Sequence, residues 1–367
     1  MGKNKNQGKN GFYYFMLDFK TRQGRKYTSM AQVAEAAGPH WQRLTQEERR
    51  PYDEKARFEK NNQKMAKYTS AGIKIDVVQK QEEEKITKEL NMRDYITKSV
   101  QNAGVGGIIA DQPFYIVHMN HFCYCNATNE YIPAEMAVCR FTLREGVTPE
   151  NVYHEIVKPG PIPLGYTFDA RKQSEEIHQL EVPDNEDPDN LDEVIRKLIK
   201  FMKERTPKNT SFPPLYTIEK NRVIAENILQ KLCNKYCYEE NLFEVYSLEY
   251  LFFVLRNSVN PNRPYPSTSS SHLELEKDVY DFCKNIPCAY HQISDVRNYC
   301  SRSYVIRLAY IICDNCCGDL NIDLIPGQHV PIDSFITASR SVSRVSSLLN
   351  IYSVSTFQCL LLGSRKL

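Results

Sequence analysis

The spacing of apolar residues changes abruptly along the chain, and this change limits the chain to two parts of different fold class. In residues 28–69 apolar side chains recur every three or four positions, as on one face of a helix. In residues 113–143 they alternate with polar side chains, which is the pattern of half-buried strands. The Gly-containing stretch 101–107 separates the two patterns and predicts a loop at a domain boundary. With 367 residues the chain can form a core in each part.

Two capping signals define helices in the first part. Ser29 can cap a helix that runs through Trp41, because a serine oxygen accepts a hydrogen bond from the first turn. Thr45 and Glu48 have the spacing of a capping box and begin another helix. Pro51 lies inside that helix and should kink it, since proline removes a helical hydrogen bond.

A third, short aromatic helix is expected over residues 12–18. The only tryptophan of the chain, Trp41, falls on the inward face of the second helix. We expect it to form an aromatic core with Phe15 and Tyr52, which would join the three helices into an L-shaped module.

Charge is distributed unevenly between the two parts. Residues 1–70 contain 15 Lys and Arg against 7 Asp and Glu, a net charge of +8, so the rest carries −6 of the total of +2. A basic module on a mildly acidic body indicates a polyanion as the partner of the module. No apolar run reaches the ~20 residues of a membrane span, and residues 1–7 lack the apolar segment of a signal peptide. We therefore expect the cytosol or nucleus, where the 12 cysteines are thiols or metal ligands.

The sequence of the larger part predicts a mixed sheet flanked by helices. Strands are predicted at 113–125, 131–143 and 212–217, and a strand leading into a helix at 242–255. Helices are predicted at 191–202, 222–237, 272–283 and 303–317. Strands first, followed by alternating helices and strands, indicate an α/β domain. The charged residues 74–102 before it predict a solvated helix that docks weakly on this domain.

Three potential metal ligands, Cys288, His291 and Cys300, lie within 13 residues. A structural zinc site needs four ligands in tetrahedral geometry. Spacing alone identifies no fourth ligand, so a zinc site and a chance cluster of buried side chains both remain open. Cys283 is near, and the run Cys313, Cys316 and Cys317 lies in an apolar helix, where core thiols are the better interpretation.

Residues 10–15, 33–41 and 50–56 resemble the three helices of an HMG box. That family binds the minor groove or distorted nucleic acid and inserts apolar side chains between base steps. The resemblance places Phe12 and Tyr13 at the inserted position. A generic helical bundle with a solvated basic face is the alternative. The expected phosphate contacts are Lys5, Lys9, Lys20, Arg22 and Arg43.

Residues 131–143, 156–165, 288–300 and 317–331 resemble the Maelstrom domain, and an HMG box ahead of it is that family's architecture. The resemblance implies an RNase H-like fold of the DEDDh exonuclease lineage with a Glu-Cys-His-Cys zinc site. Glu135 would then be the fourth ligand beside Cys288, His291 and Cys300. We expect one structural Zn²⁺ per chain, because four protein ligands close the site.

Exonucleases of the DEDDh lineage hold two metal ions with carboxylates that include an Asp-x-Glu pair on the first strand. Residues 114–122 offer His118, Asn120 and His121 but no carboxylate, which predicts that this chemistry is absent. Some Maelstrom proteins are credited with a different activity, the cleavage of single-stranded RNA. This activity is the alternative function, and no residue of the sequence is assigned to it.

The resemblance implies a germline silencing factor of the piRNA pathway that represses transposable elements. Its expected partners are structured DNA or RNA at the HMG box, single-stranded RNA at the large domain, and piRNA-pathway proteins. Its expected location is the nucleus and the cytoplasmic, perinuclear nuage. We expect an HMG-box-like module at 1–70, a helical connector at 71–107, a Maelstrom domain at 108–331 and a Ser- and Arg-rich tail at 332–367.

Overall fold

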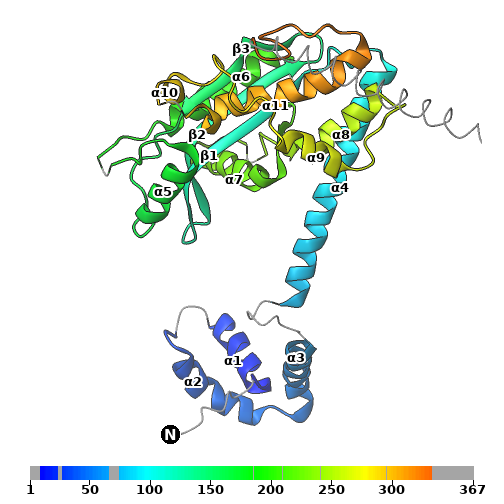
Figure 1. Cartoon of the computed structure of the whole chain (residues 1–367). Helices are drawn as coiled ribbons and strands as arrows, with labels where there is room; N and C mark the ends of the chain where they lie inside the picture. The colour runs from blue at the N-terminus through cyan, green and yellow to red at the C-terminus, as the bar shows by residue number, and fades with distance from the viewer. Residues whose placement is uncertain are drawn as a thin grey trace, which may run out of the picture. The chain divides into compact units, whose positions relative to one another are not determined.

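The chain divides into two compact units, Met1–Leu90 and Asn91–Leu367 (Figure 1). No helix among the described residues is long and apolar enough to cross a membrane. Lys5 and the tail after residue 332 lie outside the described part of the chain. The computed structural model describes residues 9–23, 27–65, 74–184, 186–208, 210–239, 241–294 and 296–332.

The first unit contains α1 (Gly11–Arg22), α2 (Met30–Arg43) and α3 (Gln46–Met65). The predicted caps are confirmed: the Ser29 side chain accepts a hydrogen bond from Gln32 N, and Thr45 N donates to Glu48 over 2.8 Å. Pro51 lies inside α3. Local capping chemistry therefore sets where α2 and α3 begin.

The predicted aromatic core holds these three helices together. The ring of Trp41 on α2 lies 5.2 Å from Phe15 on α1 and 6.1 Å from Tyr52 on α3, measured between centroids. Phe15 meets Tyr52 edge to face at 5.4 Å. The Tyr52 hydroxyl donates to Asp18 over 2.7 Å, so the polar end of that ring is satisfied as well.

A mixed five-stranded sheet lies at the centre of the second unit, in the order β3-β2-β1-β4-β5. The pairs β1–β2 and β2–β3 are antiparallel, whereas β1–β4 and β4–β5 are parallel. The prediction of a mixed sheet in an α/β domain is thus confirmed. The strands are β1 (Phe114–Cys125), β2 (Glu130–Thr142), β3 (Gly146–Ile156), β4 (Leu215–Thr217) and β5 (Val245–Ser247).

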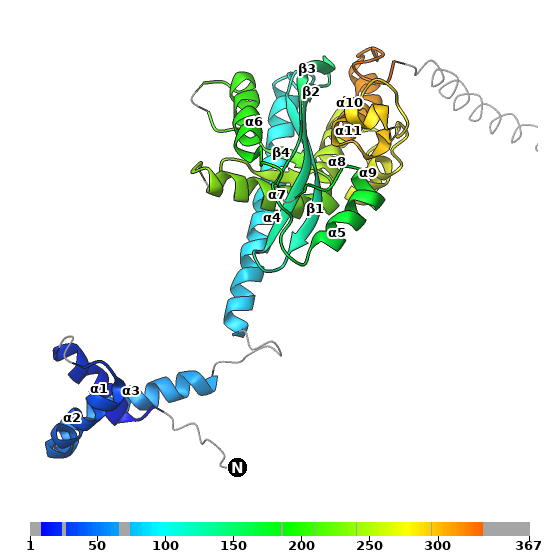
Figure 2. The ribbon, with the colours of Figure 1, turned by 90° about the vertical axis from the view of Figure 1, so that its left-hand side faces the viewer.

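Helices cover both faces of the sheet (Figure 2). The α6 (Leu191–Arg205) and α7 (Glu219–Lys235) helices pack on the face that carries Tyr115 and Val117 of β1. The opposite face, with Phe114 and Ile116, packs against α8 (Leu248–Val259) and α11 (Ser301–Cys316). The alternation of β1 therefore supplies apolar side chains to two cores. Cys313, Cys316 and Cys317 are buried in the second core, which agrees with their interpretation as core thiols.

Shorter elements surround this framework and position the candidate site. Cys288 directly precedes α10, and Cys300 directly precedes α11. These elements are α5 (Thr167–Gln173), the π-helical turn η2 (Ser174–His178), α9 (Thr268–Glu276), α10 (Ala289–Ile293), and the 3-10 turns η3 (Arg297–Tyr299) and η4 (Cys317–Leu320).

Several features differ from the sequence prediction. The helix predicted at 272–283 is α9, which ends at Glu276. The loop predicted at 101–107 is helical up to residue 105, because α4 (Ile75–Val105) buries Met92, Ile96, Val100 and Ala103 in the core. The helix stops only before Gly107, whose φ of +69° favours glycine. The prediction also lacked β3, an edge strand whose burial does not alternate strictly.

Candidate functional site

Four side chains of metal-binding type converge beside β2. Glu135 comes from β2 and His154 from β3, while Cys288 and Cys300 precede α10 and α11. One ligand atom of each lies within 4.8 Å of the other three. Glu135 and Cys300 are fully buried, whereas the His154 side chain keeps 15% of its surface exposed. The fold therefore brings together residues that are far apart in the sequence.

His291 borders the same cluster from α10. Its Nδ1 lies 3.1 Å from Cys288 Sγ and 3.6 Å from Glu135 Oε1. Its Nε2 lies 2.8 Å from the carbonyl oxygen of His178, which can only accept a hydrogen bond. A proton is therefore on Nε2, and Nδ1 is the nitrogen that faces Cys288 and Glu135. This is the arrangement in which a backbone carbonyl orients a metal-binding histidine.

The two oxygens of Glu135 have different surroundings. Oε2 accepts hydrogen bonds from Asn120 Nδ2 at 3.0 Å and Ser301 N at 2.8 Å. Oε1 faces the cluster and lies 2.7 Å from His154 Nε2. Burial opposes ionisation, but the hydrogen bond and charge of His154, the charge of His291 and the Ser301 N–H outweigh it and lower the pKa of Glu135. The result is a buried carboxylate with one oxygen directed at the sulfurs.

The two cysteines contact each other, and Cys288 N donates to Cys300 Sγ over 3.3 Å. A hydrogen bond from the Cys300 thiol, helped by His154 and His291, lowers the pKa of Cys288 well below its usual range against the effect of burial. The same bond, together with burial and the charge of Glu135, raises the pKa of Cys300. The two sulfurs lie within 4.8 Å of each other and differ in how readily they ionise. A divalent cation would relieve this arrangement by binding both as thiolates.

The distances between donor atoms can be compared with those expected around a zinc ion. Neighbouring ligand atoms around tetrahedral zinc lie about 3.3–3.8 Å apart, given bond lengths of about 2.0–2.3 Å. Glu135 Oε1 lies 3.4 Å from Cys300 Sγ and 3.6 Å from His291 Nδ1, which fits this range. The 2.7 Å between Glu135 and His154 is a hydrogen-bond distance. The 3.1 Å between Cys288 Sγ and His291 Nδ1 is shorter than this range. The structure therefore groups Glu135, Cys288 and Cys300 with His154, and His291 Nδ1 faces the same carboxylate and sulfur as a second candidate nitrogen ligand.

Two further histidines, His118 on β1 and His178 on η2, contact residues beside this cluster. His118 Nδ1 lies 3.0 Å from Ser301 Oγ, and burial lowers the pKa of His118 to about 3. His178 is fully buried, and its Nδ1 accepts from Leu180 N at 3.1 Å. Both histidines therefore have packing and hydrogen-bonding roles.

Phe12 and Tyr13, the wedge residues that we expect to insert between base steps, lie on α1 of the first unit. Phe12 is half-buried, with its ring 5.8 Å from Trp41. Tyr13 is also half-buried, and Lys9 Nζ lies 5.4 Å from its ring centroid. Phe12 thus packs on the aromatic core, and the Lys9 ammonium group lies over the ring of Tyr13.

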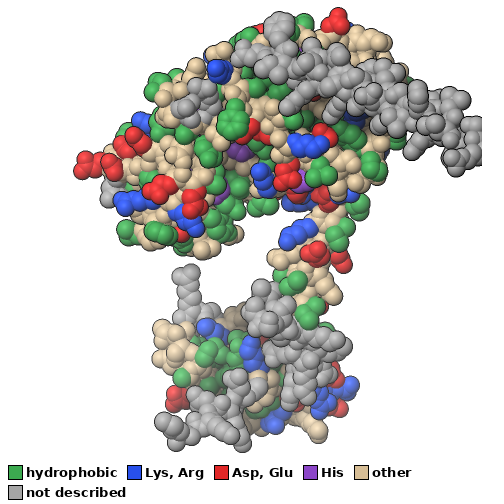
Figure 3. Space-filling model, viewed as in Figure 1, with side chains coloured by type: hydrophobic (Ala, Val, Ile, Leu, Met, Phe, Trp, Pro, Cys, Tyr) green, Lys and Arg blue, Asp and Glu red, His purple; other side chains and the backbone are tan. Residues whose placement is uncertain are grey.

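The predicted phosphate contacts differ in solvent exposure and in ion pairing. Arg22 pairs with Asp18 over 2.6 Å, whereas Arg43 is exposed and Lys20 is half-buried. On the face of the second unit drawn in Figure 3, Lys and Arg are interspersed with Asp and Glu. The described side chains visible on that face therefore form no continuous basic strip.

Comparison with known proteins matches both parts of the chain. A model of the Maelstrom family, described as a piRNA pathway germ-plasm component, matches residues 125–336, and an HMG-box model matches residues 3–70. The protein maelstrom homolog of Culex quinquefasciatus is 31% identical over 363 residues, covering 94% of this chain and 69% of the relative. Protein maelstrom of Drosophila melanogaster is 28% identical over 340 residues, covering 88% and 71%. Protein maelstrom 1 of Drosophila pseudoobscura pseudoobscura is 28% identical over 366 residues, covering 95% and 96%.

Proposed function

This chain belongs to the Maelstrom family, and from that membership we propose that it is a nucleic-acid-binding silencing factor that represses transposable elements in the germline. Family membership supports a role in the piRNA pathway, and the HMG box supports DNA binding. We place its action in the nucleus and the perinuclear nuage, together with other piRNA-pathway proteins. Transposon transcripts should rise in germ cells that lack the chain, and unchanged transcript levels would contradict the proposal.

The HMG box, which we assign to residues 1–70, binds structured DNA or RNA in this proposal. Phe12 and Tyr13 insert between base steps, and the packing of Phe12 on Trp41 supports this because it gives the wedge a rigid base. The phosphate contacts are made by Lys5, Lys9, Lys20, Arg22 and Arg43.

We assign the Maelstrom domain to residues 108–331, after a connector at 71–107. In this proposal the domain is an RNase H-like fold with a structural zinc site, called the zinc staple below because it links the sheet to a covering helix. Its ligands are Glu135, Cys288, His291 and Cys300. These four side chains would hold a zinc ion as a structural link, since four protein ligands leave no open position for a reaction. The observation that carries this assignment is the buried Glu135, whose Oε2 is held by two protein donors while Oε1 faces the sulfurs.

His154 acts on this site through Glu135. Its Nε2–H donates to Oε1, so the carboxylate cannot rotate and presents a single oxygen to the metal. Ser301 N ties the same carboxylate to the start of α11, and Cys300 lies one residue earlier. The staple therefore joins the sheet to the helix that covers it.

We propose that the domain does not perform two-metal exonuclease chemistry. The polar side chains of β1 support this, because Asn120 is committed to Glu135 and His118 to Ser301. The competing function is cleavage of single-stranded RNA by the Maelstrom domain. Incubating the purified chain with single-stranded RNA, with and without EDTA, separates the two.

A further inference from the structure

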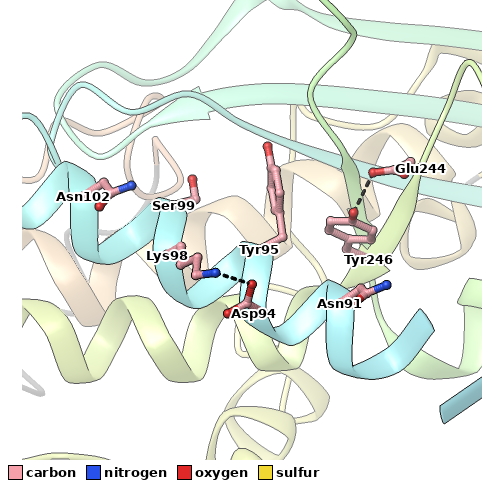
Figure 4. A pocket seen from close by; sticks show the side chains of 8 residues that line it. All are labelled: Asn91, Asp94, Tyr95, Lys98, Ser99, Asn102, Glu244 and Tyr246. Atoms are coloured by element: carbon pink, nitrogen blue, oxygen red, sulfur yellow. Dashed lines mark hydrogen bonds and ion pairs between the residues drawn. The ribbon is translucent and has the colours of Figure 1, made fainter. Parts of the chain in front are cut away.

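We propose that the groove between α4 and β5 binds the guanidinium of an arginine in an extended peptide. The groove has a volume of about 580 Å³ and lies within the second unit. Its α4 wall repeats every three or four residues, so one stripe of the helix faces the sheet edge. The lining residues are Asn91, Asp94, Tyr95, Lys98, Ser99, Asn102, Glu244 and Tyr246 (Figure 4).

Two tyrosine rings provide the aromatic surface. Tyr95 and Tyr246 stand side by side, with centroids 5.5 Å apart and ring planes at 69° (Figure 4). Tyr95 keeps 43% of its surface exposed. Tyr246 is backed at 6.2 Å by the buried Tyr216, which fixes its position. Exposed tyrosine faces attract organic cations through their ring quadrupoles.

The charge in the groove is negative and lies beside these rings. The Tyr246 hydroxyl donates to Glu244 over 2.5 Å, which holds the carboxylate next to both rings. No Lys or Arg in the described part of the chain forms an ion pair with Glu244. By contrast, Asp94 is neutralised by Lys98 at 2.7 Å. A phosphate would be repelled here, whereas a planar guanidinium can stack on a tyrosine and donate to a carboxylate at the same time.

The rest of the groove suits a peptide backbone. The side chains of Asn91, Ser99 and Asn102 form no hydrogen bond within the described residues, so their amides and hydroxyl are available to a ligand. The Ser247 N–H of β5 already donates to Met92 Sδ of α4 over 3.3 Å, so these three side chains, and not the strand edge, would hold the peptide. The arginine side chain of the peptide would supply the positively charged partner that Glu244 lacks among the described residues.

The test uses the full chain and a fluorescein-labelled peptide, Ser-Gly-Arg-Gly-Ser, with anisotropy as the readout. A citrulline peptide has nearly the same shape without the charge. We expect it to bind about tenfold more weakly, and we expect a similar loss for the arginine peptide in Glu244→Gln and Tyr95→Leu. Glu186→Gln removes an exposed charge outside the groove and should leave binding unchanged.

Equal binding of the arginine and citrulline peptides would overturn the proposal, as would equal affinity of Glu244→Gln and Glu186→Gln. A single-stranded RNA that displaces the peptide and requires Tyr95 would also overturn it, since it would make the groove a nucleic-acid site. The groove shares no residue with the metal cluster, so these outcomes leave the zinc assignment separately testable.

Discussion

Asn120 Nδ2 donates to Glu135 Oε2 over 3.0 Å, across the paired strands β1 and β2. The same amide donates to the carbonyl of Tyr299 at 3.0 Å. One side chain thus links the sheet, a buried carboxylate and the turn before α11. Under the RNase H-like ancestry that we propose, β1 is the strand that would carry catalytic carboxylates. Here its amide instead orients Glu135.

Asn120→Asp should therefore destabilise the domain rather than restore a nuclease. It places a second carboxylate about 3 Å from Glu135 and removes a donor, which should cost about 3 kcal/mol or more in unfolding free energy. The pKa of the new Asp should be higher in the folded state than in the unfolded state. The stability loss should therefore shrink as the pH falls. Thermal unfolding measures this, and Asn120→Ala is the control that loses the donor without adding charge. Equal stability of the two variants at pH 7 would contradict the prediction.

Variants of His154 distinguish a hydrogen-bond donor from a metal ligand. Gln places an amide nitrogen near the position of Nε2, so His154→Gln should keep near-normal metal affinity. His154→Ala should lose about 10- to 100-fold, as is common when a group that orients a ligand is removed. Chelator competition measures the affinity, and the visible spectrum of the Co²⁺ form should stay tetrahedral in both variants. If His154→Gln loses as much affinity as His154→Ala and its spectrum changes, His154 is itself a ligand.

The wedge assignment predicts weaker binding to bent nucleic acid when both rings are removed. Phe12→Ala with Tyr13→Ala should reduce affinity for a four-way DNA junction by about tenfold or more, since intercalating side chains stabilise the bend. Leu17→Ala, on the same helix and 38% exposed, is the matched control. Circular dichroism must show that the double variant is folded, because Phe12 contacts Trp41. Unchanged affinity of a folded double variant would exclude the wedge.

Assays of RNA cleavage address the competing function. We expect no metal-dependent trimming of single-stranded RNA, because β1 contains no carboxylate to hold two ions. Trimming from an end that EDTA abolishes would contradict our interpretation of β1. Internal cuts that persist in EDTA would support the alternative of an RNA endonuclease.

Local patterns in the sequence predicted most of the framework. The caps at Ser29 and Thr45 and the alternation in β1 depend on near neighbours, so they are readable without the fold. The helical continuation through Gly104 is not readable, because burial of Val100 and Ala103 in a distant core decides it.

The residues of the candidate site also differ in whether local sequence patterns can predict them. Cys288, His291 and Cys300 are close in sequence and were found by spacing, whereas Glu135 needed a family resemblance. His154 was missed because β3 is an edge strand without a clear alternating pattern. Only the pairing of β2 and β3 brings His154 next to Glu135.

Metal analysis of the purified full chain tests the zinc staple most directly. We predict one zinc ion per chain, lost together with thermal stability in Glu135→Ala and in Cys300→Ser. Cys237→Ser changes an exposed cysteine outside the cluster and should keep the ion. A zinc content near zero in the folded wild-type chain, or full zinc in both ligand variants, would contradict the account.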